Sequence, residues 1–267
     1  LMWTESGTPG GNTTYNAWNV GVGTNFGFSG TALDTFHAWS GSQDGGAFGG
    51  ATAITITDTR FIGQPAHSAF VGTSGMSAAA LASYDTNGFT LPWDPDHADG
   101  KLLGYLAMSG LEQAKIISFT YASGDQEVTG VGFCPDLLIV LGFVEAGDPG
   151  TALTARMSLW FANHALQQEA VTWTTIDGGL LDAGHRHSNC GRNLIQNRFG
   201  GLLDEDDAAT PLKFVVELTG MTTDGFTYTG TTHVALTVNK EFRVLCLKGI
   251  ASQIGVTNKP TTAAPAA

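Results

Sequence analysis

Internal repetition is the feature of this sequence that most constrains its fold. Residues 85–90 read DTNGFT and are followed by YLAMSG at 105–110, and residues 223–227 read TDGFT and are followed by VLCLKG at 244–249. Both stretches read as a turn, a strand, a loop and a closing strand that ends in Gly. The Asn-Gly and Asp-Gly pairs predict type I′ hairpin turns, and the Phe that follows is expected to point inward. Such recurrence indicates a duplicated unit.

Weaker matches continue upstream in the same order. Residues 5–10, 19–25, 43–46 and 60–62 parallel residues 145–150, 158–163, 176–179 and 192–195, and this alignment places Leu1 opposite Leu141. The first strands of the second unit, which begin near Leu111, then have no counterpart in the first unit. We expect that this piece either exists in a longer gene product or is supplied by a neighbouring chain through strand addition.

The repeat predicts an all-β protein with two tandem, related β-sandwich units of jelly-roll-like form. The predicted boundaries are residues 1–110 for a first unit that lacks its N-terminal strands, 111–252 for a second unit, and 253–267 for a flexible Pro/Thr/Ala-rich tail that serves as a linker or an arm. The composition agrees, because 36 Gly and only 13% charged residues are typical of short strands with many turns.

Individual segments refine this prediction. Residues 53–57 alternate with the period of a half-buried strand, whereas residues 137–141 are continuously apolar, which predicts a strand buried on both faces. Short helices are expected near residues 77–82, where Ala clusters, and near residues 163–170.

Charge and hydropathy exclude two classes of partner. The formal net charge of −12 disfavours direct nucleic-acid binding, because an acidic surface repels phosphates. No apolar stretch has the length of a membrane span, so no membrane partner is expected. The odd count of three cysteines argues against a disulfide framework, although one bridge remains open, and favours buried free thiols.

One local cluster has residue types that bind metals. His185 and His187 lie two positions apart, as on one face of a strand, and with Cys190 they form a weak candidate zinc site. A fourth ligand is not apparent nearby, so a polar loop or an interface is the preferred interpretation. The acidic residues 204–207 and 94–99 are interpreted as solvated loops rather than calcium sites, because they lack the loop pattern of such sites. No cofactor is predicted.

Enzymatic function finds little support in the residues. No Gly-x-Ser-x-Gly elbow occurs, and Cys134, which precedes a Pro at a strand entrance, is better explained by packing. A hydrolase with dispersed carboxylates remains a third hypothesis, because two such acids need no proximity in sequence. The six Trp are expected mostly in the core, with Trp93 the best candidate for an exposed ligand or interface residue. A carbohydrate-binding module of a tail or a secreted protein is therefore the alternative function.

Residues 128–140, VTGVGFCPDLLIV, resemble a motif of structural proteins from tailed bacteriophages. In that family a "GFxPD" element is followed by "dGFt" and a closing "ylalkG", which correspond here to residues 132–136, 224–227 and 244–249. The resemblance implies a virion protein, such as a capsid decoration, collar or tail component, and it transfers no catalytic residue. We therefore expect a non-enzymatic protein that binds other virion proteins and assembles as a homo-oligomer. Its residual acidity suits the outside of the particle, away from packaged DNA.

Overall fold

The computed structural model describes residues 2–5, 15–24, 34–43, 52–57, 62–65, 76–79, 82–85, 88–92, 104–143, 150–152, 154–176, 190–203, 212–233 and 241–255, and for the strands before residue 82 it describes the backbone only. Every regular element in these ranges is a β-strand, and all the strand pairs are antiparallel. The expectation of an all-β protein is confirmed for this part of the chain.

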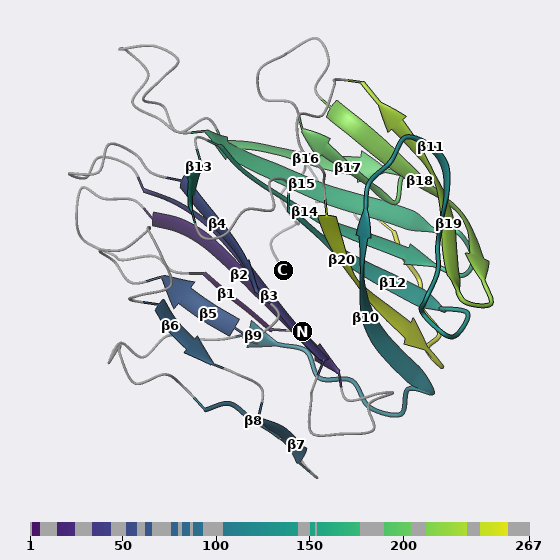
Figure 1. The fold of residues 1–267 in the computed structure, drawn as a ribbon, viewed down its shortest axis with the longest axis horizontal. Helices are drawn as coiled ribbons and strands as arrows, with labels where there is room; N and C mark the ends of the chain where they lie inside the picture. The colour runs from purple at the N-terminus through teal and green to yellow at the C-terminus, as the bar shows by residue number, and fades with distance from the viewer. Residues whose placement is uncertain are drawn as a thin grey trace, which may run out of the picture.

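A six-stranded sheet, which we call the middle sheet, lies at the centre of the fold (Figure 1). Its strand order differs from the chain order, because the last strand of the described chain inserts between β10 and β12. In spatial order the strands are β10 (Gln113–Thr120), β20 (Glu241–Lys248), β12 (Leu137–Phe143), β14 (Thr154–Asn163), β15 (Gln168–Ile176) and β16 (Cys190–Gln196).

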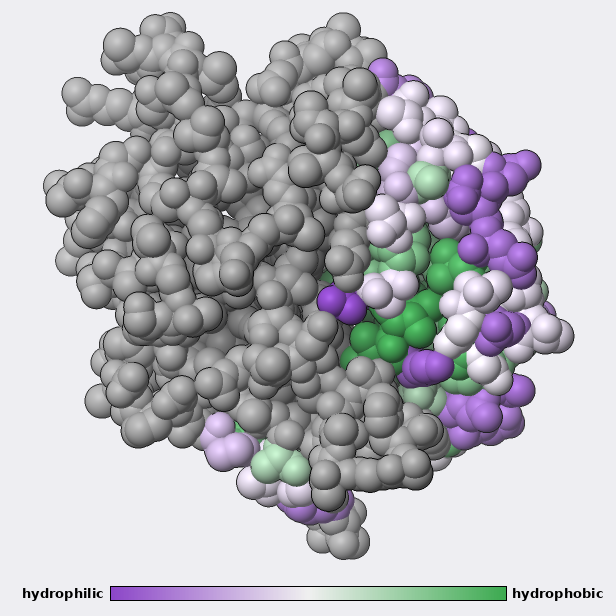
Figure 2. All heavy atoms as spheres, viewed as in Figure 1, coloured by the Kyte–Doolittle hydropathy of each residue, from purple (hydrophilic) through white to green (hydrophobic). Residues whose placement is uncertain are grey.

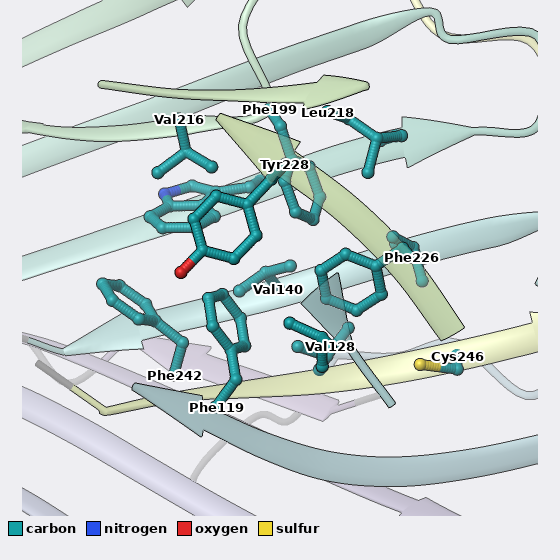
Figure 3. Packing of buried hydrophobic residues seen from close by; sticks show 14 of the residues in the cluster. Phe119, Val128, Val140, Phe199, Val216, Leu218, Phe226, Tyr228, Phe242 and Cys246 are labelled. Carbon is teal, nitrogen blue, oxygen red and sulfur yellow. The ribbon is translucent and has the colours of Figure 1, made fainter. Parts of the chain in front are cut away.

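A four-stranded sheet, the outer sheet, covers one face of the middle sheet. Aromatic rings fill the space between the two sheets (Figure 3), as expected for a β-sandwich core. Phe119 of the middle sheet contacts both Phe226 and Tyr228 of the outer sheet, with ring centroids 5.7 and 5.6 Å apart. The outer strands are, in spatial order, β11 (Gly124–Val128), β19 (Gly225–Thr232), β18 (Leu212–Thr222) and β17 (Gly200–Leu203).

Strand β12 explains why residues 137–141 are continuously apolar. Leu138 and Val140 point into the core shared with the outer sheet, whereas Leu137, Ile139 and Leu141 belong to a second apolar cluster. Successive side chains of a strand point to opposite faces, so both faces of β12 are buried. The prediction of a doubly buried strand is confirmed.

Another six-stranded sheet, the first sheet, lies on the side of the middle sheet opposite the outer sheet (Figure 1). Its edge strand β13 comes from the range predicted for the second unit. The remaining strands form two separate hairpins, β5 (Ile62–Pro65) with β6 (Met76–Ala79) and β7 (Ser83–Asp85) with β8 (Gly88–Thr90). The first sheet contains, in spatial order, β13 (Gly150–Ala152), β4 (Thr52–Thr57), β3 (Asp34–Gln43), β2 (Tyr15–Thr24), β1 (Met2–Glu5) and β9 (Gly104–Tyr105).

Both helix predictions are wrong. Residues 76–79 form β6, where pairing with β5 outweighs the helix propensity of Ala. Residues 164–167 connect β14 to β15, which begins at Gln168. Buried Gln168 and Ala170 flank a partly exposed Glu169 with the period of a strand.

The type I′ turn predicted at Asp224-Gly225 is also wrong. Thr222 pairs with Gly225, so Thr223 and Asp224 form the turn, and neither has a positive φ. Gly225 is required for another reason: a Cβ at this position would collide with the backbone carbonyl of Val128 on the neighbouring strand.

Candidate functional site

The loop that carries the Gly-x-Gly-Phe-x-Pro-Asp motif is held by a carboxylate from a distant part of the chain. Asp224, at the β18–β19 turn, accepts hydrogen bonds from the backbone N–H groups of Gly132 at 2.6 Å and Gly130 at 3.0 Å. Its own backbone carbonyl accepts a third, from Val131 at 3.0 Å. Gly130 and Gly132 have positive φ angles of +89° and +85°, which let both N–H groups face one carboxylate.

This arrangement has an electrostatic consequence. The N–H groups of Gly130 and Gly132 hold the pKa of the Asp224 carboxyl below its ordinary value, and the positive charge of Lys115 acts in the same direction. Lys115 also donates a 2.6 Å hydrogen bond from Nζ to the Gly130 carbonyl. The carboxylate of Asp224 and the ammonium group of Lys115 therefore supply hydrogen-bond partners to backbone N–H and C=O groups of the loop.

A second carboxylate acts in the same way at the end of the motif. Asp136 Oδ2 accepts a 2.7 Å hydrogen bond from the N–H of Gly249, which follows β20 and has a φ of +83°. The N–H of Asp136 donates to the Leu247 carbonyl at 2.8 Å. Asp224 and Asp136 are thus both committed to main-chain hydrogen bonds that join segments far apart in sequence.

A thiol and an imidazole meet beside this loop. The Sγ of Cys134 lies 3.8 Å from Nδ1 of His164, which is exposed in the β14–β15 turn. Such a pair is one element of a nucleophilic cysteine site. In the part of the chain that the structure describes, however, no carboxylate bonds to the imidazole to orient it. Sequence reasoning missed this pair, because Cys134, just before β12, and His164, in the β14–β15 turn, come together only in the folded chain.

The β14–β15 turn also fixes the segment that follows β20. Buried Asn163 donates from Nδ2 to the Gln167 Oε1 at 2.7 Å and to the Ser252 carbonyl at 3.0 Å. Gln167 Oε1 in turn accepts a 3.2 Å hydrogen bond from the Ile254 N–H. Ile254 falls in the range predicted as tail, but it packs against the apolar cluster on the middle sheet. Residues 256–267 lie outside the described residues.

The predicted ligand residues fall largely outside the described chain. His185, His187 and Trp93 lie in ranges that the structure does not describe, as do the acidic residues 94–99 and 204–207. Cys190 begins β16 and its backbone pairs with Thr175, but its side chain is not described. Within the described ranges no group of three potential metal ligands occurs. The same residues include no helix with the length and apolarity needed to cross a membrane.

The remaining two cysteines and one tryptophan can be placed. Cys246 is fully buried in the sandwich core (Figure 3) with a free thiol, as predicted, and burial raises its pKa to about 12. Cys134 is a free thiol that is only half-buried. Trp160 is fully buried between the sheets, in agreement with a core role rather than a sugar-binding one.

Large apolar side chains are exposed at the end of the first sheet. Tyr105 of β9 is 61% exposed and the next residue, Leu106, is 46% exposed. The Tyr105 ring contacts the half-buried Phe89 of β8 edge-to-face, with centroids 5.5 Å apart. A cluster of this kind on a strand at a sheet edge is a candidate binding surface. Figure 2 shows a second apolar area in the described part of the molecule, beside the region drawn in grey.

Comparisons with known proteins give no relative. No family model matches the chain, and neither a curated protein nor a solved structure is significantly similar to it.

Proposed function

We propose that this protein is a non-enzymatic structural protein, built from two tandem related β-sandwich units, that binds neighbouring subunits in an assembly. The observation that carries the proposal is the use of two carboxylates, that of Asp136 in the motif and that of Asp224, which binds the motif loop. Asp224 and Asp136 each accept backbone N–H groups from remote segments, so the motif builds a rigid scaffold rather than a reactive site.

The strand orders support the tandem relation. The first sheet runs β9-β1-β2-β3-β4 and the middle sheet runs β20-β12-β14-β15-β16, with the corresponding strands in the same chain order. The registers agree as well. Met2 pairs with both Gly21 and Tyr105, and Val140 pairs with both Trp160 and Val244. The repeat in the sequence aligns Tyr105 with Val244.

The next strand pairs, β2–β3 and β14–β15, correspond in the same way. The β2–β3 ladder starts with the pair Tyr15 and Gln43, and the β14–β15 ladder starts with Thr154 and Ile176. Gln43 and Ile176 are also aligned in the sequence repeat. At the first strand the register differs from the sequence alignment. The sequence alignment places Leu1 opposite Leu141, whereas the strand register places Met2 opposite Val140. We interpret the shared order and register as two copies of one unit.

The composition fits an assembly role. A surface with few Lys and Glu side chains can be buried in interfaces with a small cost of charge desolvation and of side-chain ordering. We place the protein on the outside of a tailed-bacteriophage particle, as a capsid decoration, collar or tail component. This placement rests on the resemblance of residues 128–140 to phage structural proteins and on the net charge of −12, which suits a position away from packaged DNA.

The test is the molar mass of the purified protein by light scattering over a concentration series. A defined oligomer, or growth into rings or filaments, supports the proposal. A monomer at every concentration contradicts it, and a glycan array would then test the carbohydrate-binding alternative.

A further inference from the structure

Two fully buried polar side chains of β14 have no hydrogen-bond partner among the residues that the structure describes. Ser158 and Trp160 are both 0% exposed, and within these residues nothing bonds to the Ser158 Oγ or to the Trp160 Nε1. Buried polar groups in folded proteins are nearly always paired, because burial removes the water that would otherwise bind them. A buried hydroxyl and a buried indole N–H that are both unpaired therefore point to a further polar group in the core.

Both side chains lie on the same face of the middle sheet. Trp160 belongs to the core shared with the outer sheet, and Ser158 precedes it by two positions on β14. Side chains two positions apart on a strand point to the same face of the sheet. Thr172 of β15, which pairs with Ser158, is also 0% exposed. Ser158 therefore faces the interior of the sandwich, as Trp160 does.

The Trp160 ring reaches the part of the core that contains Ser158. Phe242 of β20, shown in Figure 3, pairs with Gly142 of β12, and Gly142 pairs with Ser158, so these three residues form one row across the middle sheet. The rings of Trp160 and Phe242 are in contact, with centroids 4.5 Å apart. Because Gly142 has no side chain, the indole can lie over it, next to Ser158. The two unpaired polar atoms thus occupy the same end of the core.

The packing around the indole limits the size of what can bind there. Phe199 and Phe214 contact the Trp160 ring edge-to-face, with centroids 5.6 and 6.4 Å away. On another side Gly200 approaches so closely that a Cβ at this position would overlap the indole. An interior packed at this density admits a water molecule, whereas a larger polar ligand would have to displace one of these rings.

We propose that a buried water molecule joins Ser158 to Trp160 inside the sandwich. An indole N–H only donates, whereas a serine hydroxyl both donates and accepts. The water oxygen accepts from the Trp160 Nε1–H, and one water O–H donates to the Ser158 Oγ. Internal waters make about three hydrogen bonds, so a further bond to the surrounding chain completes the site. The water fixes the orientation of the indole against Gly200. The site lies in the core and does not depend on the assembly role proposed above.

Nuclear magnetic resonance of the full chain, with its tryptophan indoles labelled with the heavy nitrogen isotope, locates the water. The Trp160 Hε1 signal is assigned as the one that disappears in Trp160→Phe. We expect a rotating-frame cross-peak between this proton and the water resonance, with a sign opposite to that of the diagonal. That sign identifies a dipolar contact with a long-lived water and excludes simple hydrogen exchange of the indole.

Magnetic relaxation dispersion of the water oxygen counts the long-lived waters, because it does not detect exchanging hydroxyl protons. Ser158→Val removes the hydroxyl and fills its surroundings with methyl groups, so the dispersion amplitude should fall by the equivalent of about one water molecule per chain. The matched control is Ser118→Val, which makes the same change at an exposed position of β10. It should leave the amplitude at the wild-type value.

Either of two results would overturn the proposal. One is the absence of a dipolar cross-peak between water and the Trp160 Hε1 in the folded wild-type chain. This measurement needs no serine variant, so it decides the question even where Ser158→Val does not fold. The other is an equal dispersion amplitude in wild type and in Ser158→Val that is folded by circular dichroism, since a water bound there would then not depend on Ser158.

Discussion

Gln168 and Leu218 join the two sheets of the sandwich through a reciprocal pair of hydrogen bonds. The Oε1 of Gln168, on β15, accepts from the Leu218 N–H at 2.8 Å, and its Nε2 donates to the Leu218 carbonyl at 3.3 Å. The β18–β19 register shifts between Leu218 and Gly220. The Gln168 amide therefore bonds both the N–H and the C=O of Leu218 at the point where the ladder is irregular.

We predict that Gln168→Ala lowers the free energy of unfolding by about 2–4 kcal/mol, because it leaves a buried donor and a buried acceptor without partners. Urea denaturation followed by far-UV circular dichroism measures the change. The matched control is Gln126→Ala, which removes a partly exposed amide that donates to the Ser123 carbonyl and should cost less than about 0.5 kcal/mol. Equal losses for the two variants would show that the bridge contributes nothing specific.

Asp224 should make stability depend on acidity. Its folded-state pKa lies below the ordinary value of 3.8, so its contribution is present above that value and is lost as the pH falls through the folded pKa. Asp224→Asn should therefore lower the urea midpoint at neutral pH, and the difference from wild type should shrink in strong acid. Glu217→Gln, which removes a surface carboxylate paired with Arg198, controls for net charge. A difference between wild type and Asp224→Asn that stays constant with pH would contradict the assignment.

Gly200 in β17 packs directly against the ring of Trp160, and a Cβ at this position would overlap the indole. Gly200→Ala should destabilise the chain by about 1–3 kcal/mol, as overpacking does in a dense core. Trp160→Phe in the same chain should recover part of that loss, which a double-mutant cycle in urea would measure. Gly88→Ala, which meets open space, is the control and should change little.

The two cysteines whose side chains are described should differ in reactivity. Burial raises the pKa of Cys246 to about 12, whereas Cys134 is half-buried in a surface loop. In a Cys190→Ser background, a thiol reagent at mildly alkaline pH should label Cys134 at least about a hundredfold faster than Cys246. Peptide mass mapping assigns the label, and denatured protein supplies the control in which both react. Fast labelling of Cys246 in the native chain would contradict the buried core.

The outcome of the sequence predictions follows from the range over which each signal acts. The apolar run of residues 137–141 predicted a doubly buried strand, and Phe226 is fully buried as the Gly-Phe-Thr motif predicted. Helix prediction failed at residues 76–79, because pairing with β5 decides the conformation there. The motif itself was visible in the sequence, but the hydrogen bonds of Asp224 to Gly130 and Gly132 were not, because those residues lie far apart in the chain.

The sequence by itself determined the all-β class of the described residues and the doubly buried strand, because the pattern of apolar side chains along a strand acts over a few residues. Tertiary structure alone decided that β20 inserts between β10 and β12, that Cys134 meets His164, and that Tyr105 is exposed where Val244 is covered. These relationships depend on which strands become neighbours. That choice is made by packing two apolar faces over the whole domain, which no local pattern of residues encodes.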